Sequence, residues 1–279
     1  MMVQFGPILL RRAGILGVLA GAALATGVAR AEVNISPLRQ VITDEARTAT
    51  YRVSNPSNRI IEGRLRWIDL SATETGYVDA TPEQREKLSA APYLTVWPAF
   101  FRLEPGADVT VTVAAKVGAP LPAGEHRSHL LVETDAVRTP LRKAGGSLEV
   151  DIGLGISTPV ILRGGKGDAG ATIGETHLLR TTDGSLELET NVEPKGEFSA
   201  YGRIDVVFTP RTNKGAGAPE VLRSIDNVAA YIDAPRRRVM APLGVQELPG
   251  GVLEVRYVGR SEFEGETFAT RSFEIAPPR

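Results

Sequence analysis

The chain has 279 residues, and its 32 Lys and Arg residues nearly balance its 33 Asp and Glu residues, giving a formal net charge of −1. That balance argues against a nucleic-acid binder, which would carry a surplus of positive charge. The sequence contains no cysteine, so disulfides and a thiol nucleophile are excluded and stability must come from packed cores.

The N-terminal segment predicts a secretory signal peptide. Arg11 and Arg12 precede an apolar run over residues 13–28, and Ala29-Arg30-Ala31 follows as a small-residue cleavage site. A retained membrane anchor is the alternative, but glycine and threonine interrupt the run. We therefore expect residues 1–31 to be a signal peptide and the remaining chain, which has no other long apolar run, not to span a membrane.

Residues 32–160 consist of short apolar runs separated by turn residues, which predicts strands. The expected strands are Leu38–Ile42, Thr48–Val53, Ile60–Leu70, Tyr93–Val96, Phe100–Leu103, Asp108–Ala115, His126–Glu133 and Leu148–Ile156. One short helix is expected between Thr81 and Ala90, because Thr81 suits an N-cap and Pro82 the first helical position. Repeated short strands with regular turns favour an immunoglobulin-like β-sandwich.

The last of these strands is unusually regular. From Ser147 to Ser157 apolar residues alternate strictly with polar residues or glycine, and eleven strand residues span roughly 36 Å. The apolar row is Leu148, Val150, Ile152, Leu154 and Ile156. The row either packs on its own core or extends beyond it to cover a partner, and a bulge at Gly153 or Gly155 would allow both.

A second β-sandwich is expected over residues 171–279, after a linker at residues 161–170 that is rich in glycine. Its expected strands are His177–Arg180, Leu186–Val192, Gly202–Phe208, Val228–Ile232, Arg238–Ala241, Leu253–Val258 and Thr267–Ile275. Asp183-Gly184 between two alternating runs indicates a hairpin. The sequence therefore predicts an all-β chain of two domains.

Two motifs could suggest a cofactor site or a metal site. The linker matches G-x-G-x-x-G at residues 165–170, but no helix is predicted after it, so a dinucleotide site is not expected. Glu125, His126 and His129 lie close together, yet residues three apart on a strand point to opposite faces and cannot chelate one ion. We expect no metal and no cofactor.

The remaining charged groups suggest no enzyme. Arg236-Arg237-Arg238 is either an anion-binding patch or, more commonly, a solvated turn. Glu187 and Glu189 lie on the solvated face of a strand, and no Ser/His/Asp arrangement is found.

Four segments of the first domain carry a family resemblance. They are Ile35–Ile42, which contains Arg39, Tyr51–Pro56, Trp97–Gly106 with the pattern P-x-x-x-R-L-x-P-G, and Leu121–Ser128. Together they resemble the periplasmic chaperones of chaperone–usher pilus assembly, the PapD-like family. The alternating strand at Ser147–Ser157 then takes the place of that family's strand G.

The resemblance implies two immunoglobulin-like β-sandwich domains in an L-shaped arrangement and a non-enzymatic periplasmic chaperone. Such a chaperone binds pilin or fimbrial subunits by donor-strand complementation and delivers them to an outer-membrane usher. Arg39 would hold the carboxylate at the subunit's C-terminus. Strand G would supply the apolar row Leu148, Val150, Ile152, Leu154 and Ile156.

The chain departs from the family's pattern at the carboxylate site. The family pairs the arginine with a lysine on strand G, but no Lys or Arg lies between Leu148 and Leu162, and counting back from Pro159 puts Leu154 at that position. The anchor is then Arg39 alone, or Arg163 contributes. The family's R-P after strand G is replaced by Thr158-Pro159, which leaves its ion network between domains open.

Two alternatives follow from the residues alone. Arg39, without the resemblance, would be interpreted as an exposed strand arginine. The whole chain would then be a periplasmic two-domain β-sandwich module for a carbohydrate or an envelope protein, with exposed aromatic residues in a pocket. The chain has few aromatic residues, 6%.

Overall fold

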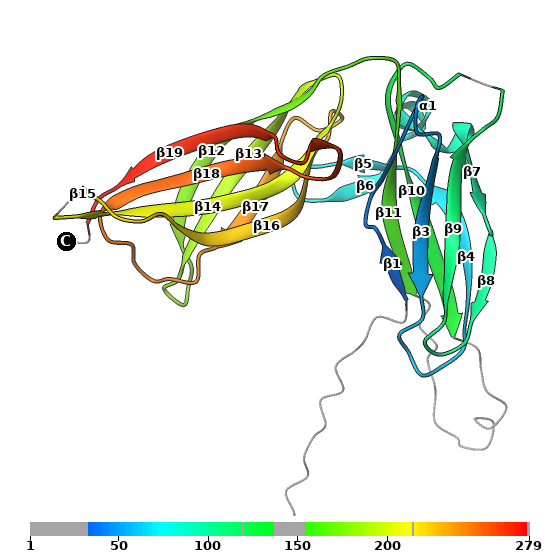
Figure 1. The fold of residues 1–279 in the computed structure, drawn as a ribbon, viewed down its shortest axis with the longest axis horizontal. Coiled ribbons are helices and arrows are strands. Elements are labelled where there is room, and N and C mark those ends of the chain that lie inside the picture. Colours follow the sequence, from blue (N-terminus) through cyan, green and yellow to red (C-terminus); the bar gives the residue numbers. More distant parts are fainter. Residues whose placement is uncertain (1–32, 119, 137–153, 214, 278–279) are drawn as a thin grey trace, which may run out of the picture. The chain divides into compact units, whose positions relative to one another are not determined.

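The computed structural model describes residues 33–118, 120–136, 154–213 and 215–277 (Figure 1). Within these ranges strands dominate, and they form two sandwiches with separate apolar cores. The predicted all-β class with two β-sandwich domains is confirmed. No helix in the described ranges is long and apolar enough to cross a membrane.

The first sandwich has two sheets, with strand orders β1-β3-β9-β7 and β2-β11-β10-β4-β8. Its strands are β1 Asn34–Ser36, β2 Gln40–Thr43, β3 Thr48–Ser54, β4 Ile61–Ile68, β7 Leu94–Trp97, β8 Phe100–Leu103, β9 Asp108–Ala115, β10 Gly124–Ala136 and β11 Leu154–Gly164. A small hairpin of β5 Leu70–Ala72 and β6 Tyr77–Asp79 lies outside these sheets. Most predicted strands therefore exist, with bounds shifted by a few residues.

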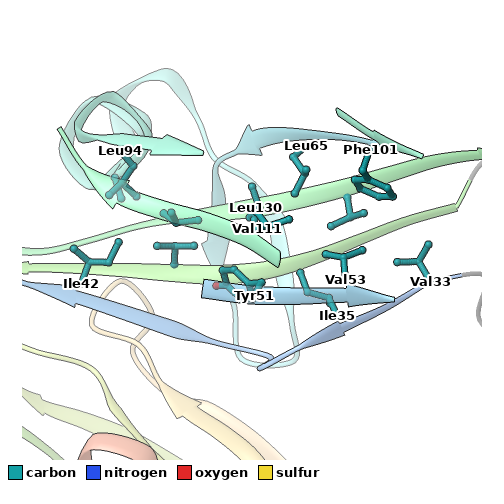
Figure 2. Close-up of a cluster of buried hydrophobic side chains, with 14 of the residues drawn as sticks. Val33, Ile35, Ile42, Tyr51, Val53, Leu65, Leu94, Phe101, Val111 and Leu130 are labelled. Carbon is teal, nitrogen blue, oxygen red and sulfur yellow. The ribbon is translucent and has the colours of Figure 1, made fainter. Parts of the chain in front are cut away.

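The two sheets enclose a core of alternate inward side chains (Figure 2). Tyr51 and Val53 of β3, Val111 of β9 and Leu130 of β10 are at most 1% exposed. The Tyr51 hydroxyl donates a hydrogen bond of 3.3 Å to the carbonyl oxygen of Pro159, so the polar end of this ring is satisfied. This hydrogen bond links the middle of β3 to β11.

The turn residues of the resembling motifs have structural roles. The Asn55 side-chain amide donates to the carbonyl oxygens of Arg59, Leu103 and Glu104 at 2.7–3.2 Å. Gly106 takes a positive φ of 77°, which favours glycine, and its N–H donates to the Asn55 carbonyl. The β3–β4 loop is therefore fastened to the β8–β9 turn.

The predicted helix is α1, Pro82–Leu88, and it begins and ends close to the expected residues. Thr81 and Gln84 form a capping box, in which each side chain accepts a hydrogen bond from the other's backbone N–H. The helix has no buried residue, as its polar sequence predicts.

Strand β11 runs on beyond the predicted end at Ile156, as far as Gly164. It is antiparallel to β10 from Leu154 onward and parallel to β2 only from Val160 to Arg163. The residues expected as the start of a linker, 161–164, therefore belong to the first sandwich. Proline is tolerated at position 159 because the pairing with β2 starts one residue later.

The second sandwich pairs a sheet of order β12-β13-β17 with a sheet of order β15-β14-β18-β19, to which β16 is added at β14. Its strands are β12 Ala169–Arg180, β13 Leu186–Gly196, β14 Ala200–Thr212, β15 Gly215–Ala216, β16 Glu220–Ala230, β17 Arg237–Pro242, β18 Gly251–Gly259 and β19 Thr267–Ile275. Gly184 has a φ of 86° in the β12–β13 hairpin that the sequence predicts. Strand β16 escaped prediction over most of its length because it is largely exposed and lacks a regular apolar alternation.

The G-x-G-x-x-G motif leads into strand β12 rather than into a helix. A dinucleotide site needs the N-terminus of a helix at this point to face the pyrophosphate. The motif therefore serves as the short connection between β11 and β12.

The first core predicts a clear stability effect. We expect Leu130→Ala to destabilise the first sandwich by about 2–5 kcal/mol, because Leu130 is 0% exposed and its loss leaves a cavity. Leu38→Ala is the matched control, since Leu38 is 56% exposed and its truncation should cost well under 1 kcal/mol. Urea unfolding followed by tryptophan fluorescence measures both. Equal midpoints for the two variants would contradict the packing described.

Candidate functional site

One face of β10 carries a row of buried polar residues that contact the second sandwich and the β5–β6 hairpin. Glu125, Arg127 and His129 alternate along the strand, and all three are less than 8% exposed. An alternating polar row on a strand is ordinarily solvated, so its burial requires partners. Two of the three residues have carboxylate or guanidinium partners, which come from β11 and from the second domain.

The first group centres on Arg163 near the end of β11. Its Nε donates to Glu125 at 2.9 Å, and one terminal nitrogen donates to the carbonyl oxygen of Ser199 at 2.8 Å. Glu125 in turn accepts from the Ser199 backbone N–H at 2.9 Å and from its hydroxyl. The Arg163 and Glu125 side chains are only 7% and 2% exposed, so each depends on the other for compensation.

This group resolves the question that Thr158-Pro159 left open. An ion network does join the two sandwiches, and Arg163 contributes to it by pairing with Glu125 of β10 and with Glu262 of the second sandwich. The one signal for it in the sequence is the alternating polar row Glu125, Arg127 and His129 of β10.

The second group pairs Arg127 with Asp233 of the second sandwich. Two terminal nitrogens of Arg127 donate to the two oxygens of Asp233 at 2.7 and 2.9 Å, and the guanidinium carbon lies 3.9 Å from the centre of the Tyr231 ring. Burial alone would raise the pKa of the Asp233 carboxyl, but the Arg127 hydrogen bonds and charge outweigh it and hold that pKa below its ordinary value. A bidentate pair of this kind fixes orientation as well as charge.

Arg39 is buried, contrary to the interpretation of a surface arginine. It is 8% exposed, one terminal nitrogen donates to Glu262 at 2.8 Å, and its guanidinium carbon lies 4.6 Å from the centre of the Tyr201 ring. Glu262 also accepts from Arg163 at 3.0 Å, so one carboxylate serves both arginines. The Nε and the second terminal nitrogen of Arg39 have no hydrogen-bond partner among the described residues.

Arg39 lines a pocket of about 150 Å³. The pocket draws residues from both sandwiches, and its aromatic lining residues are Tyr77, Tyr201 and Tyr231. Pro159 is the β11 residue in this lining, and it lies five positions after Leu154, the residue that the resemblance puts at the position of the family's lysine. Among the described residues of β11, none with a charge lines this pocket.

The β5–β6 turn closes one side of this region through Glu74. Its carboxylate accepts from Arg236 at 2.8 Å and from Arg238 at 3.0 Å. The Glu74 carbonyl also accepts from the Arg238 backbone N–H at 2.7 Å. Two residues of the arginine triplet are therefore engaged by a carboxylate of the first domain.

The described part of the predicted donor strand has an unpaired edge. Strand β11 pairs with β10 along its whole length, but no described strand pairs with residues 154–159 on the opposite side. Ile156 is half-buried and packs against the first core, on the same face as buried Val160 and Leu162. Ile156, the last residue of the apolar row, thus packs on the chain's own core.

The earlier part of that row is not described. Leu148, Val150 and Ile152 lie outside the described residues, and of Leu154 only the backbone is described. Their predicted role stays a prediction.

The two histidines of β10 do not share a site. His129 contacts Tyr77 with ring centres 4.8 Å apart, whereas His126 contacts Tyr93 at 5.8 Å. Among the described residues no cluster of three or more His, Asp or Glu side chains could hold a metal ion.

Several solved structures are similar to this chain. The YadV chaperone has 14% identity and a TM-score of 0.43, covering 88% of this chain and 100% of its own. The CupB2 chaperone of Pseudomonas aeruginosa has 15% identity and a TM-score of 0.40, covering 86% and 98%. The SafA pilin complex with the SafB chaperone of Salmonella enterica gives 17% identity and 0.41, covering 87% and 96%. No family model and no curated protein matches the sequence.

The buried His129 predicts a pH dependence of stability. Burial, and then the nearby charge of Arg127, lowers its pKa to about 3, below an unfolded value of about 6.5. The unfolded chain therefore binds a proton that the folded chain does not between pH 6.5 and 3, and stability falls by about 1 kcal/mol per pH unit as the pH drops through this window.

We expect His129→Phe to reduce this slope, whereas the exposed His177→Phe should retain it. Urea unfolding at a series of pH values measures both. The same slope in His129→Phe and the native chain would show that His129 is not held neutral by burial.

Proposed function

We propose that this chain is a non-enzymatic periplasmic chaperone that binds pilin or fimbrial subunits by donor-strand complementation. The observation that carries the proposal is the unpaired edge of β11 at residues 154–159, which continues from the alternating apolar row and ends beside the Arg39 pocket. Delivery to an outer-membrane usher and export through the signal peptide at residues 1–31 belong to the same proposal.

The unpaired edge supports strand addition. A strand edge offers free N–H and C=O groups, to which another chain can add as a new strand. On β11 this edge begins where pairing with β2 stops, next to Pro159. A subunit that lacks one strand of its own sandwich would gain the missing ladder from β11.

The apolar row supplies the second part of the interaction. Leu148, Val150 and Ile152 precede the residues that pack on the chain's own core, so in the proposal they fill the pockets of the subunit's groove. Leu154 and Ile156 complete the row where β11 leaves its own sandwich. Burial of three such side chains contributes on the order of 5–9 kcal/mol before the costs of ordering.

The pocket supplies the third part. In the proposal, Arg39 binds the carboxylate at the C-terminus of the subunit, which fixes the register of the added strand. Its buried guanidinium has hydrogen-bonding groups without partners, and such groups are stabilised by a charge-assisted hydrogen bond.

Capture of a subunit tests the function. We expect the chain, co-expressed in the periplasm with secreted proteins encoded beside its gene, to retain one of them through affinity purification. Val150→Asp with Ile152→Asp should lower the retained amount at least tenfold, because two charges would enter an apolar groove.

The matched control is Glu149→Ala with Asp151→Ala, which alters the alternate positions of the same segment and should leave retention unchanged. Circular dichroism establishes that both variants are folded. Full retention by the folded Asp variant would exclude strand donation, and retention of no subunit by the native chain would favour a carbohydrate or envelope-protein binding module.

A further inference from the structure

The three arginines at residues 236–238 do not share the same contacts. Arg236 and Arg238 both contact the carboxylate of Glu74, at 2.8 and 3.0 Å. Arg237 is the first residue of strand β17 and is half-buried. It lies on the same face of the strand as buried Val239 and Ala241. Among the described residues its side chain has no ion pair or hydrogen bond.

Arg237 lines the same pocket as Arg39. Among the described residues that line it, the charged ones are Arg39, Arg236 and Arg237, and none is Asp or Glu. Glu262 compensates Arg39 and Glu74 compensates Arg236, from outside the lining. The charge of Arg237 is left without such a partner, so the pocket has a net positive charge.

A positive pocket walled by apolar and tyrosine side chains favours an anion over a neutral ligand. Charges in a partly buried pocket are screened less than exposed charges, and a carboxylate accepts hydrogen bonds from guanidinium groups in a preferred planar geometry. Arg39, at 8% exposure with two unpartnered groups, provides an independent indication of an anion at this place.

We infer that Arg237, from the second sandwich, is the second cation that binds the C-terminal carboxylate of the subunit together with Arg39. The inference rests on the proposed function and deepens it. The carboxylate is then held between a residue that precedes β2 and a residue of β17, so binding draws on both domains. Strand β11 therefore does not have to supply the second cation, and its lining residue can be the uncharged Pro159.

The test compares two forms of one peptide. The probe is the C-terminal strand of the subunit retained by the native chain, synthesised once as the free acid and once as the C-terminal amide. Isothermal titration calorimetry with the native chain should show tighter binding of the acid, and this preference should weaken as salt is raised.

We expect Arg237→Gln to reduce the preference for the acid about tenfold while leaving affinity for the amide unchanged. Arg237→Lys should recover part of the preference, because it keeps the charge without the planar fork. Arg39→Gln should also reduce it. Arg211→Gln is the control, since Arg211 pairs with Glu274 and does not line the pocket.

The outcomes separate the inference from the function. An undiminished acid preference in Arg237→Gln would overturn the role of Arg237 and leave the chaperone proposal standing. Equal affinities of acid and amide for the native chain would overturn the carboxylate pocket while retaining strand donation. Retention of no subunit by the native chain would overturn both.

Discussion

The buried ion pair between Arg163 and Glu125 joins the end of strand β11 to β10, and both residues hydrogen-bond Ser199 of the second sandwich. Neither group tolerates burial alone, since the loss of one partner of such a pair typically costs about 3–5 kcal/mol. The Ser199 backbone accepts a hydrogen bond from Arg163 and donates one to Glu125. Glu262 accepts hydrogen bonds from both Arg163 and Arg39. The position of Arg39 at its pocket therefore depends on the same contacts that join β11 to the second domain.

Strand β11 has two environments along one length. From Val160 onward it lies between β10 and β2 and packs against the first core. From Leu154 to Pro159 no described strand pairs with it on the side opposite β10, and half-buried Ile156 packs against the first core. A strand that is paired on both sides over one segment and on one side over another suits the proposed strand donation, in which the chain presents an edge to a partner.

Period-two alternation and turn residues were enough to predict the class, the two sandwiches and most strands, because inward-facing apolar residues dominate them. Most of β16 could not be predicted, because an exposed edge strand has no apolar alternation. The full length of β11 could not be predicted either, because Pro159 is typical of a strand end. From the residues alone Arg39 is predicted to be exposed, and only the resemblance assigns it to a carboxylate site. Glu262, Asp233 and Arg237 lie more than 70 positions from their partners or pocket neighbours on the first domain, and no local pattern brings them together.

The most direct measurement is amide hydrogen exchange of strand β11 with and without a captured subunit. If β11 is donated, the amides of Leu154–Ser157 that point to the unpaired edge exchange freely in the isolated chain. In the complex their exchange is slowed at least tenfold. The amides of Val160–Arg163 are protected in both states. If the amides of Leu154–Ser157 exchange equally fast in the complex and in the isolated chain, the subunit does not pair with β11, and the central claim is wrong.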